Sequence, residues 1–528
     1  MRSQHLLAGA ALAVGQAAAD PEVLPTPPMG YNNWARFMCN LNETLFKDTA
    51  DAMLDKGLLD AGYDRINLDD CWMTTERHDN GSVKINETLF PSGIAALGDY
   101  IHERGFHFGI YQDAGNLTCG GFAGSLGYEE IDAQDFVNWG VDYLKLDGCY
   151  VPELDGLDLQ NTYKKIYSHW HDIFSAMDDP LIFSESAPAY FCDEDDLTDW
   201  YNVMDWVPSY GELARHSWDI AVHGSEGTWD SILANYGANV LFARYQKPGY
   251  YNDPDYIIPD WPDLTMDEKR SQFAIWCAFS APLIISAHIP DLTDEDIAYL
   301  TNQDLIDIDQ DEKAEQAALV SQDGTWDVLT RSLANGDRVV AALNRGDEPA
   351  SQKISAERLG LVSDDGATYQ VKDLWTGETT EATTEVDTGE VPSHGTAIFR
   401  ISGVKDVIPT GMLFNTASKL CLDAADAIIT TNCSAADSQV WQVREDGSIR
   451  SLADTESCLA EKDGKAESAA CKEGEKSQVW TYKLHGYVVN AGSENCLTEG
   501  AEGTTVEKCG GKDNQQVFAL PVGGKIVA

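Results

Sequence analysis

The chain has 528 residues, of which 43% are hydrophobic and 10% aromatic, and this composition excludes wholesale disorder. Acidic residues number 87 against 36 basic residues, which gives a net charge of −51. A polyanion of this size is repelled by nucleic acid and by anionic membranes, so we expect neither as a partner. The length predicts about three to four domains.

The first residues have the pattern of a secretory signal peptide. Met1 and Arg2 precede an apolar run over 6–14 and small residues up to Ala19, so residues 1–19 are predicted to be removed on export. The protein is therefore expected to be secreted and extracellular, where its twelve cysteines can form disulfides. Four sequons are consistent with this route, and they predict glycosylation at Asn42, Asn86, Asn116 and Asn432.

Residues 25–300 alternate between short apolar strands and helical segments. Strands are predicted over 65–68, 107–111, 141–146, 181–184 and 282–286, and helices over 44–59, 93–104 and 132–139. Repeated β-then-α units imply a parallel sheet, and about 275 residues suit a (β/α)8 TIM barrel. A doubly wound sheet is the alternative, but no Gly-x-Gly-x-x-Gly follows the first strand.

Acidic residues follow several of these strands. In a (β/α)8 barrel the carboxyl ends of the strands meet at one mouth, so these acids are expected to lie together. Paired carboxylates hydrolyse glycosidic bonds, whereas a carboxylate cluster can also hold a divalent metal. Lys145 lies two residues before Asp147 and faces the same way, which disfavours a metal. We therefore expect a carbohydrate substrate, no metal and no cofactor. The acids are Asp69, Asp70, Asp113, Asp147, Glu185, Asp253 and Asp255.

Residues 303–402 contain short alternating segments separated by turn signals such as Asn335-Gly336-Asp337. This pattern predicts an antiparallel β domain. The segment 403–411 is predicted to link it to the tail.

The tail, residues 409–528, repeats itself three times. A Cys-Leu pair recurs at 421, 458 and 496, and a Gln-Val-aromatic run recurs at 439–441, 478–480 and 516–518. Three copies at one period indicate three units that share a core. The pattern resembles the ricin-type β-trefoil lectin domain. That resemblance implies one disulfide in each repeat: Cys421–Cys433, Cys458–Cys471 and Cys496–Cys509.

An Asp after the first Cys binds sugar in that lectin family. Only the first repeat has it, as Asp423, because the other repeats carry Ala460 and Thr498 there. The tail is therefore either a lectin with one carbohydrate ligand or a purely structural trefoil.

Residues 25–402 resemble glycoside hydrolase family 27, which contains α-galactosidases and α-N-acetylgalactosaminidases. The resemblance implies an antiparallel β-sandwich after the barrel. It implies the disulfides Cys39–Cys71 and Cys119–Cys149, and none for Cys192 or Cys277. The matching runs are Pro27-Pro28-Met29-Gly30-Tyr31-Asn32-Asn33-Trp34, Arg36-Phe37-Met38-Cys39-Asn40, Asp69-Asp70-Cys71-Trp72, Gly109-Ile110-Tyr111, Lys145-Leu146-Asp147-Gly148-Cys149 and Asn252-Asp253-Pro254-Asp255.

The same resemblance assigns roles to individual residues. Asp147 is implied to be the nucleophile and Asp219 the acid/base, with Glu212 as the alternative acid. Arg215, four residues before Asp219, is implied to bind sugar hydroxyls. Asp69 and Asp70 are implied to accept hydrogen bonds from the 4- and 6-hydroxyls of galactose. Trp34, Tyr111 and Lys145 are implied to complete the pocket.

The strip 183–190 is implied to contact the substituent on C2 of the sugar. If the strip is aligned on its acid, Glu185 fills the C2 space, as in a galactosidase. If it is aligned on Pro188-Ala189-Tyr190, Ser186 and Ala189 leave room for an acetamido group.

The function that the resemblance implies is a retaining exo-α-galactosidase working by double displacement. Its substrates would be galacto-oligosaccharides, galactomannans or related glycoconjugates with terminal α-galactose. An α-N-acetylgalactosaminidase of the same mechanism is the alternative. A non-catalytic lectin with a decayed barrel and a metal-dependent barrel enzyme are the competing classes.

Overall fold

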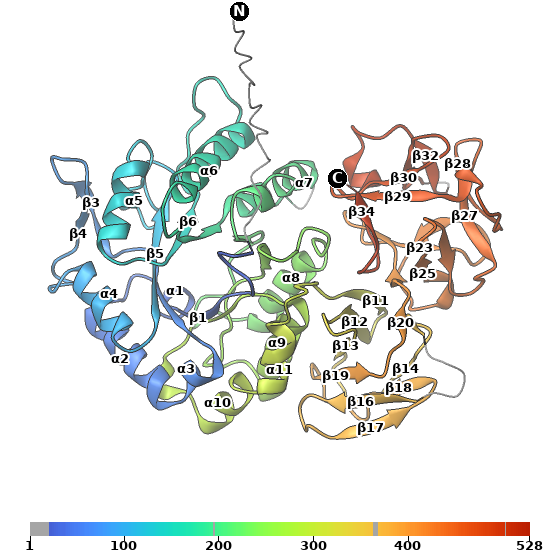
Figure 1. Ribbon diagram of the computed structural model, residues 1–528, viewed down its shortest axis with the longest axis horizontal. Coiled ribbons are helices and arrows are strands. Elements are labelled where there is room, and N and C mark those ends of the chain that lie inside the picture. The colour runs from blue at the N-terminus through green and yellow to red at the C-terminus, as the bar shows by residue number, and fades with distance from the viewer. Residues whose placement is uncertain (1–20, 194–195, 363–367, 502, 528) are drawn as a thin grey trace, which may run out of the picture.

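A computed structural model describes residues 21–193, 196–362, 368–501 and 503–527, so the predicted signal peptide lies outside the described residues. Figure 1 shows three domains: a barrel ringed by helices on the left, an antiparallel β domain at the lower right and a second β domain at the upper right. This order confirms the predicted fold class of a TIM barrel, a β-sandwich and a β-trefoil.

The barrel consists of eight parallel strands in the order β10-β1-β2-β5-β6-β7-β8-β9. Between the two ends of this order, the Ile257 amide donates to the Ile284 carbonyl at 2.8 Å and the Ser286 amide to the Ile257 carbonyl at 2.8 Å, which closes the barrel. The strands are β1 (Met29–Asn32), β2 (Arg65–Leu68), β5 (His107–Asp113), β6 (Tyr143–Asp147), β7 (Ile182–Glu185), β8 (Leu213–Arg215), β9 (Tyr251–Asp253) and β10 (Leu283–Ile285).

Helices cover the outside of the barrel, so the apolar strands are buried on both faces. The predicted helix over 44–59 is two helices, because Gly57 has a left-handed φ of 75° between them. The helices are α1 (Trp34–Phe37), α2 (Glu43–Asp55), α3 (Leu58–Ala61), α4 (Ile94–His102), α5 (Glu129–Asn138), α6 (Leu159–Ser175), α7 (Thr198–Met204), α8 (Thr228–Asn239), α9 (Met266–Phe279), α10 (Asp294–Leu300) and α11 (Gln303–Asp309). A hairpin, β3 (Met73–Arg77) and β4 (Val83–Ile85), projects beside them.

The apolar stretch over 273–289 belongs to helix α9 and strand β10, which a turn at Ser280 separates. Both elements are buried in the barrel. Among the described residues, no helix has the length and apolarity that crossing a membrane requires.

The middle domain is built on a six-stranded antiparallel sheet in the order β11-β12-β13-β19-β16-β17. The pairs β14-β18 and β15-β20 complete it, so part of the predicted linker 403–411 is a paired strand. The strands are β11 (Ala318–Gln322), β12 (Trp326–Ser332), β13 (Arg338–Asn344), β14 (Lys353–Ser355), β15 (Leu361–Val362), β16 (Tyr369–Asp373), β17 (Thr379–Ala382), β18 (Glu385–Asp387), β19 (Thr396–Ser402) and β20 (Asp406–Val407).

The last domain has the three-fold arrangement that its repeats predict. Leu422, Leu459 and Leu497 of the three Cys-Leu pairs lie in one core with Trp441, Trp480 and Phe518 of the Gln-Val-aromatic runs. Its elements are β21 (Thr410–Met412), β22 (Phe414–Asn415), β23 (Cys421–Asp423), β24 (Ile429–Thr431), β25 (Val440–Val443), β26 (Ile449–Ser451), β27 (Ser457–Lys462), β28 (Lys465–Ala470), β29 (Trp480–Lys483), β30 (Val488–Asn490), β31 (Cys496–Thr498), β32 (Thr505–Glu507), α12 (Asp513–Gln516), β33 (Phe518–Ala519) and β34 (Ile526–Val527).

The trefoil packs directly on the barrel. Phe414, Val517 and Ala519 of the trefoil belong to the same hydrophobic cluster as the barrel core. Buried Arg244, which follows α8, donates to the carbonyls of Leu484 at 2.8 Å and His485 at 3.2 Å. The two domains therefore share apolar and polar contacts.

Candidate active site

The register of the barrel strands places several candidate residues at one mouth. Lys145 on β6 lies beside Tyr111 on β5 and Ser184 on β7, and Asp147 lies beside Asp113. Neighbours in a parallel register face the same side of the sheet, and alternate residues along a strand share a face. Tyr111, Lys145 and Asp147 therefore point together into the barrel.

Asp69, directly after β2, is held in a buried polar network. Its Oδ2 accepts hydrogen bonds from Asn32 Nδ2 at 2.7 Å and from Lys145 Nζ at 2.8 Å. Tyr256 donates to the same oxygen at 3.2 Å and accepts from Lys145 Nζ at 3.0 Å. Burial lowers the pKa of Lys145, but Asp69, Tyr256 and Asp147 together outweigh it, so that pKa lies well above its ordinary value. The amine is a fixed positive charge.

Asp70, the next residue, is fully buried beside this network. Its carboxylate accepts from the amides of Cys71 at 2.6 Å and Gly120 at 2.8 Å. Burial nevertheless raises the pKa of Asp70 to about 6. The Cys39–Cys71 disulfide joins this loop to the segment after α1. Trp34 begins that helix, and its amide donates to Asn32 Oδ1 at 2.8 Å.

Asp147 ends β6 and is surrounded by hydrogen-bond donors. Tyr111 donates to its Oδ2 at 3.3 Å, the Gly148 amide to its Oδ1 at 3.0 Å, and Tyr190 to the same Oδ1. Burial and the charge of Asp147 raise the pKa of Tyr190 far above its ordinary value, so that hydroxyl keeps its proton. The Asp147 carboxylate is thus fixed in orientation while remaining only half-buried.

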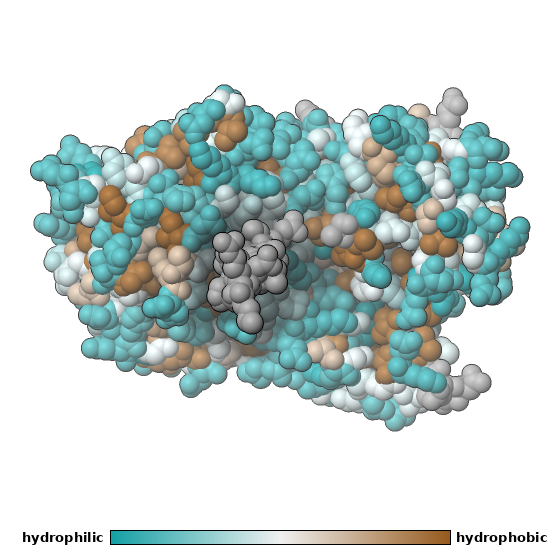
Figure 2. Space-filling view, turned by 45° about the horizontal axis from the view of Figure 1, so that its top comes forward, coloured by the Kyte–Doolittle hydropathy of each residue, from teal (hydrophilic) through white to brown (hydrophobic). Residues whose placement is uncertain are grey.

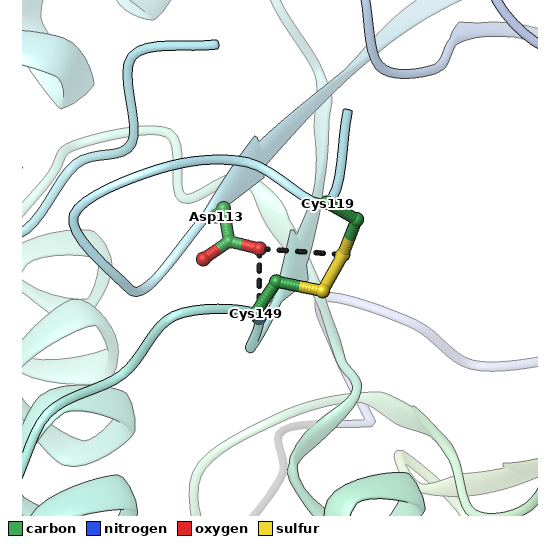
Figure 3. Close-up of side chains that lie close together, drawn as sticks. All are labelled: Asp113, Cys119 and Cys149. Atoms are coloured by element: carbon green, nitrogen blue, oxygen red, sulfur yellow. Dashed lines mark hydrogen bonds between the residues drawn. A yellow bond between two sulfur atoms is a disulfide. The ribbon is translucent and has the colours of Figure 1, made fainter. Parts of the chain in front are cut away.

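Asp113 supports the loops around Asp147. Its carboxylate accepts from the amides of Gly115 at 2.7 Å and Cys149 at 2.9 Å, and Cys119 Sγ lies 3.7 Å away (Figure 3). Burial and the charge of Asp147 raise the pKa of Asp113 well above its ordinary value. Both cysteines are joined in a disulfide, so neither offers a thiolate to a metal, and the group ties the loop after β5 to the loop after β6.

Arg215, at the end of β8, lies between two carboxylates. Its Nη2 is 3.1 Å from Asp219 Oδ1 and 2.9 Å from Asp255 Oδ2. Partial enclosure raises the pKa of Asp219, but the charges of Arg215 and Lys145 outweigh this, so that pKa is below its ordinary value. The Asp219 side chain is 67% exposed, so it is accessible from solvent.

Tyr256 is the residue that sequence reasoning missed. Asp255 belongs to the run Asn252-Asp253-Pro254-Asp255, which the sequence places at the mouth and which matches the family, but its partner is not predicted. In the structure Asp255 holds Arg215, and Tyr256 contacts both Asp69 and Lys145. The contact of Asp255 with Arg215 depends on how β8 and β9 pair, which the local sequence does not reveal.

The two alternative C2 residues lie in different places. Glu185 lies beside Leu146, so it faces the helices and not the mouth, and burial together with the charge of Glu212 raises its pKa well above its ordinary value. Ser186 is buried before the short 3-10 helix Ala187–Phe191, which carries Ala189 and Tyr190. Glu212 lies just before the first residue of β8, at the far end of that strand from Asp219.

The trefoil contains a second candidate site. Asp423 Oδ2 accepts from Gln439 Nε2 at 3.0 Å. In the other repeats Gln478 donates to the Ala470 carbonyl and Gln516 to Thr498 Oγ1. Each repeat contains one disulfide, Cys421–Cys433, Cys458–Cys471 or Cys496–Cys509. Of the sequon residues, Asn42, Asn116 and Asn432 are exposed and Asn86 is half-buried.

Comparison with known proteins shows which families the three domains of the chain resemble. A model of the alpha galactosidase A family matches residues 26–311, one of the alpha galactosidase C-terminal beta sandwich domain matches 323–401, and one of the ricin-type beta-trefoil lectin domain matches 409–518. Alpha-galactosidase A from Aspergillus niger is 54% identical over 510 residues, which are 95% of this chain and 93% of that protein. An alpha-galactosidase from Cyamopsis tetragonoloba is 34% identical and covers 71% of this chain and 85% of its own.

Solved structures agree with these matches. The crystal structure of alpha-galactosidase I from Mortierella vinacea superimposes with a TM-score of 0.65 at 27% identity. The match covers 74% of this chain and all of that one.

Proposed function

Since the chain belongs to the alpha galactosidase A family, we propose that it is a secreted, retaining exo-α-galactosidase that removes terminal α-linked galactose. The observation that carries this proposal is the position of Asp147. It ends β6 at the mouth of the barrel and accepts hydrogen bonds from Tyr111, Tyr190 and Gly148. Its substrates would be galacto-oligosaccharides and galactomannans, which suit an exported enzyme.

Asp147 is proposed as the nucleophile and Asp219 as the acid/base. In a double displacement the first carboxylate attacks the anomeric carbon, while the second protonates the departing oxygen and later deprotonates water. Arg215 contacts Asp219, so a proton has to reach Asp219 before the leaving group departs. The exposed Asp219 side chain can take that proton from solvent.

Asp69 and Asp70 are proposed to recognise the hydroxyls of galactose. Asp69 is paired with Lys145. Asp70, whose pKa is about 6, is protonated at acidic pH and can then donate a hydrogen bond as well as accept one. Together they give a site the donors and acceptors to select the axial 4-hydroxyl of galactose over the equatorial one of glucose.

The Asp147→Asn variant tests the mechanism. The amide has the same shape but cannot attack as a carboxylate does, so hydrolysis of an aryl α-galactoside should fall to background in a protein with unchanged melting temperature. For the wild type, NMR should detect α-galactose as the first product. Normal turnover in the variant, or β-galactose as the first product, would show that the nucleophile or the mechanism is misassigned.

The trefoil is proposed to hold one carbohydrate ligand at Asp423. The support is that Gln439 donates to Asp423, because only the first repeat has a carboxylate at this position. Titration with galactose, comparing wild type with Asp423→Ala, distinguishes this site from a purely structural trefoil. Binding that persists in Asp147→Asn and disappears in Asp423→Ala would belong to the trefoil.

A further inference from the structure

A large cleft lies between the middle β domain and the trefoil, away from the mouth of the barrel. Its volume is about 1720 Å³, and none of the residues described above at the mouth or around Asp423 line it. Its walls come from the turn between β12 and β13, strand β20, the hairpin β25–β26, strand β29 and the C-terminal segment with β34.

The charge of this cleft is opposite to that of the protein. In the whole chain acidic residues outnumber basic ones by 87 to 36, and the face in Figure 2 is largely hydrophilic. In the cleft basic residues outnumber the four acidic ones, Glu312, Asp406, Glu445 and Asp446. A clustering of cations on an acidic protein creates a local field that concentrates anions. The basic residues are Lys313, Arg338, Lys405, Arg444, Arg450 and Lys525.

Two of these arginines contain buried N–H groups without a partner. Arg338 has no exposed surface, and its Nη1 donates to Ser332 Oγ at 2.7 Å. Within the described part of the chain, Arg338 Nε and Nη2 and Arg444 Nε have no hydrogen-bond acceptor. Burial lowers the pKa of Arg338 to about 10, and burial together with nearby Arg450 lowers that of Arg444. Buried donors without acceptors are costly, so an anion would stabilise this arrangement.

The side chains that line the cleft and its volume favour one class of anion. A guanidinium pairs with a carboxylate through two parallel hydrogen bonds. Apolar side chains, among them Val443, Ile449 and Leu520, line the cleft beside the arginines and suit the C–H faces of sugar rings. Its volume exceeds the roughly 300–1,000 Å³ of sites for single small molecules, so several sugar rings fit. We propose that this cleft binds an acidic oligosaccharide through its uronate carboxylates.

This binding is separable from catalysis and is tested on the full-length protein. Calorimetry at acidic pH and low salt compares trigalacturonate with neutral β-linked galactotriose, both in excess galactose to occupy the mouth and the Asp423 site. Trigalacturonate should bind under these conditions and the neutral trisaccharide should not. No binding of trigalacturonate, or full displacement by galactose, would overturn the proposal.

Charge-removing variants locate the site. Arg444→Gln with Arg450→Gln should weaken trigalacturonate binding about tenfold or more, because charged hydrogen bonds contribute about 1.5–3 kcal/mol each. The control pair, Lys462→Gln with Lys465→Gln, removes the same charge from the hairpin β27–β28 outside the cleft and should change binding less than about twofold. Both pairs should keep wild-type hydrolysis of a small aryl galactoside, and an unchanged melting temperature should show that the trefoil remains folded.

Two further outcomes would contradict the proposal. An equal loss in both pairs would mean general attraction of charge and no defined site. Competition by inorganic sulfate at the same charge concentration would mean a small-anion site only. A failure of catalysis, by contrast, would appear in the aryl galactoside assay and not in the calorimetry.

Discussion

Adjacent residues of the strip 183–190 face different environments, and this decides which of them can contact substrate. Glu185 faces the helices, while Ser186 precedes the 3-10 helix whose Tyr190 donates to Asp147. The placement favours the alignment in which Ser186 and Ala189 border the C2 position of the sugar. Both side chains are small, which leaves room at that position.

The C2 specificity is therefore predicted to depend on Ser186 and Ala189. The double variant Ser186→Glu with Ala189→Leu should remove any hydrolysis of aryl α-N-acetylgalactosaminide, because the larger side chains overlap the acetamido group. For aryl α-galactoside, the activation free energy that kcat/KM reports should change by no more than about 1–3 kcal/mol, which is the contribution of one apolar contact. The matched control is Glu185→Gln, which should alter neither of these two activities. A change of specificity in Glu185→Gln alone would favour the alignment in which Glu185 fills the C2 space.

Glu185 is predicted to make the protein more stable in acid than at neutral pH. Both of its oxygens are buried, and neither has a hydrogen-bond partner among the described residues. Its pKa is raised above the ordinary 4.5 on folding, so its contribution is fully present below about pH 4.5 and is lost as the pH rises through the folded-state pKa. Glu185→Gln should raise the melting temperature at pH 8 and change it little at pH 4; a uniform shift at both values would contradict this.

At the scale of elements, the segment after α8 makes polar contacts between barrel and trefoil. Arg244 donates to the Leu241 carbonyl at 2.6 Å and reaches two carbonyls of the loop after β29. Nearby, His485 of that loop pairs with Asp205 at 2.5 Å. The loop is therefore held at two points on the barrel.

Removal of the Arg244 side chain is predicted to loosen this loop. Arg244→Met leaves the partly buried carbonyls of Leu484 and His485 without this donor, at a cost of up to about 1–3 kcal/mol each. Melting temperature should fall, and amide exchange of the trefoil should become faster, while kcat on a small galactoside stays the same. Arg104→Met is the control: Arg104 pairs with Asp51 and Tyr100 at the surface, and its loss should cost less than about 1 kcal/mol. Equal effects of both variants would contradict the proposed contact.

At the scale of the molecule, the repeats of the tail suggest an independent module, but the structure has one hydrophobic cluster that extends from the barrel into it. Phe414, Val517 and Ala519 pack with the barrel core, and part of 403–411 pairs with β15. The trefoil is therefore a structural part of the enzyme in addition to any lectin role.

Deletion of residues 409–528 is predicted to destabilise the barrel without removing its catalytic groups. The groups proposed for catalysis all precede residue 260, so folded molecules should hydrolyse aryl α-galactoside at near the wild-type rate. The deletion should lower the melting temperature, because burial of each large apolar side chain stabilises the fold by about 1.5–3 kcal/mol and this is lost where the barrel surface is exposed. The exposed surface should also bind a hydrophobic dye. An unchanged melting temperature would mean that the shared core contributes nothing.

The sequence by itself determined the three domains and the mouth with Asp69, Asp70 and Asp147, while its resemblance to two known families implied the pairing of ten cysteines. The domains and the mouth follow from local patterns: the alternation of strand and helix, acids at strand ends, and repeats of fixed period. Only the tertiary structure decided that Glu185 faces the helices, that Tyr256 joins Asp69, and that Asp255 holds Arg215. It also decided the cleft between the domains and the shared core. Such features depend on which distant surfaces pack together and in which register, and short-range periodicity contains no information about either.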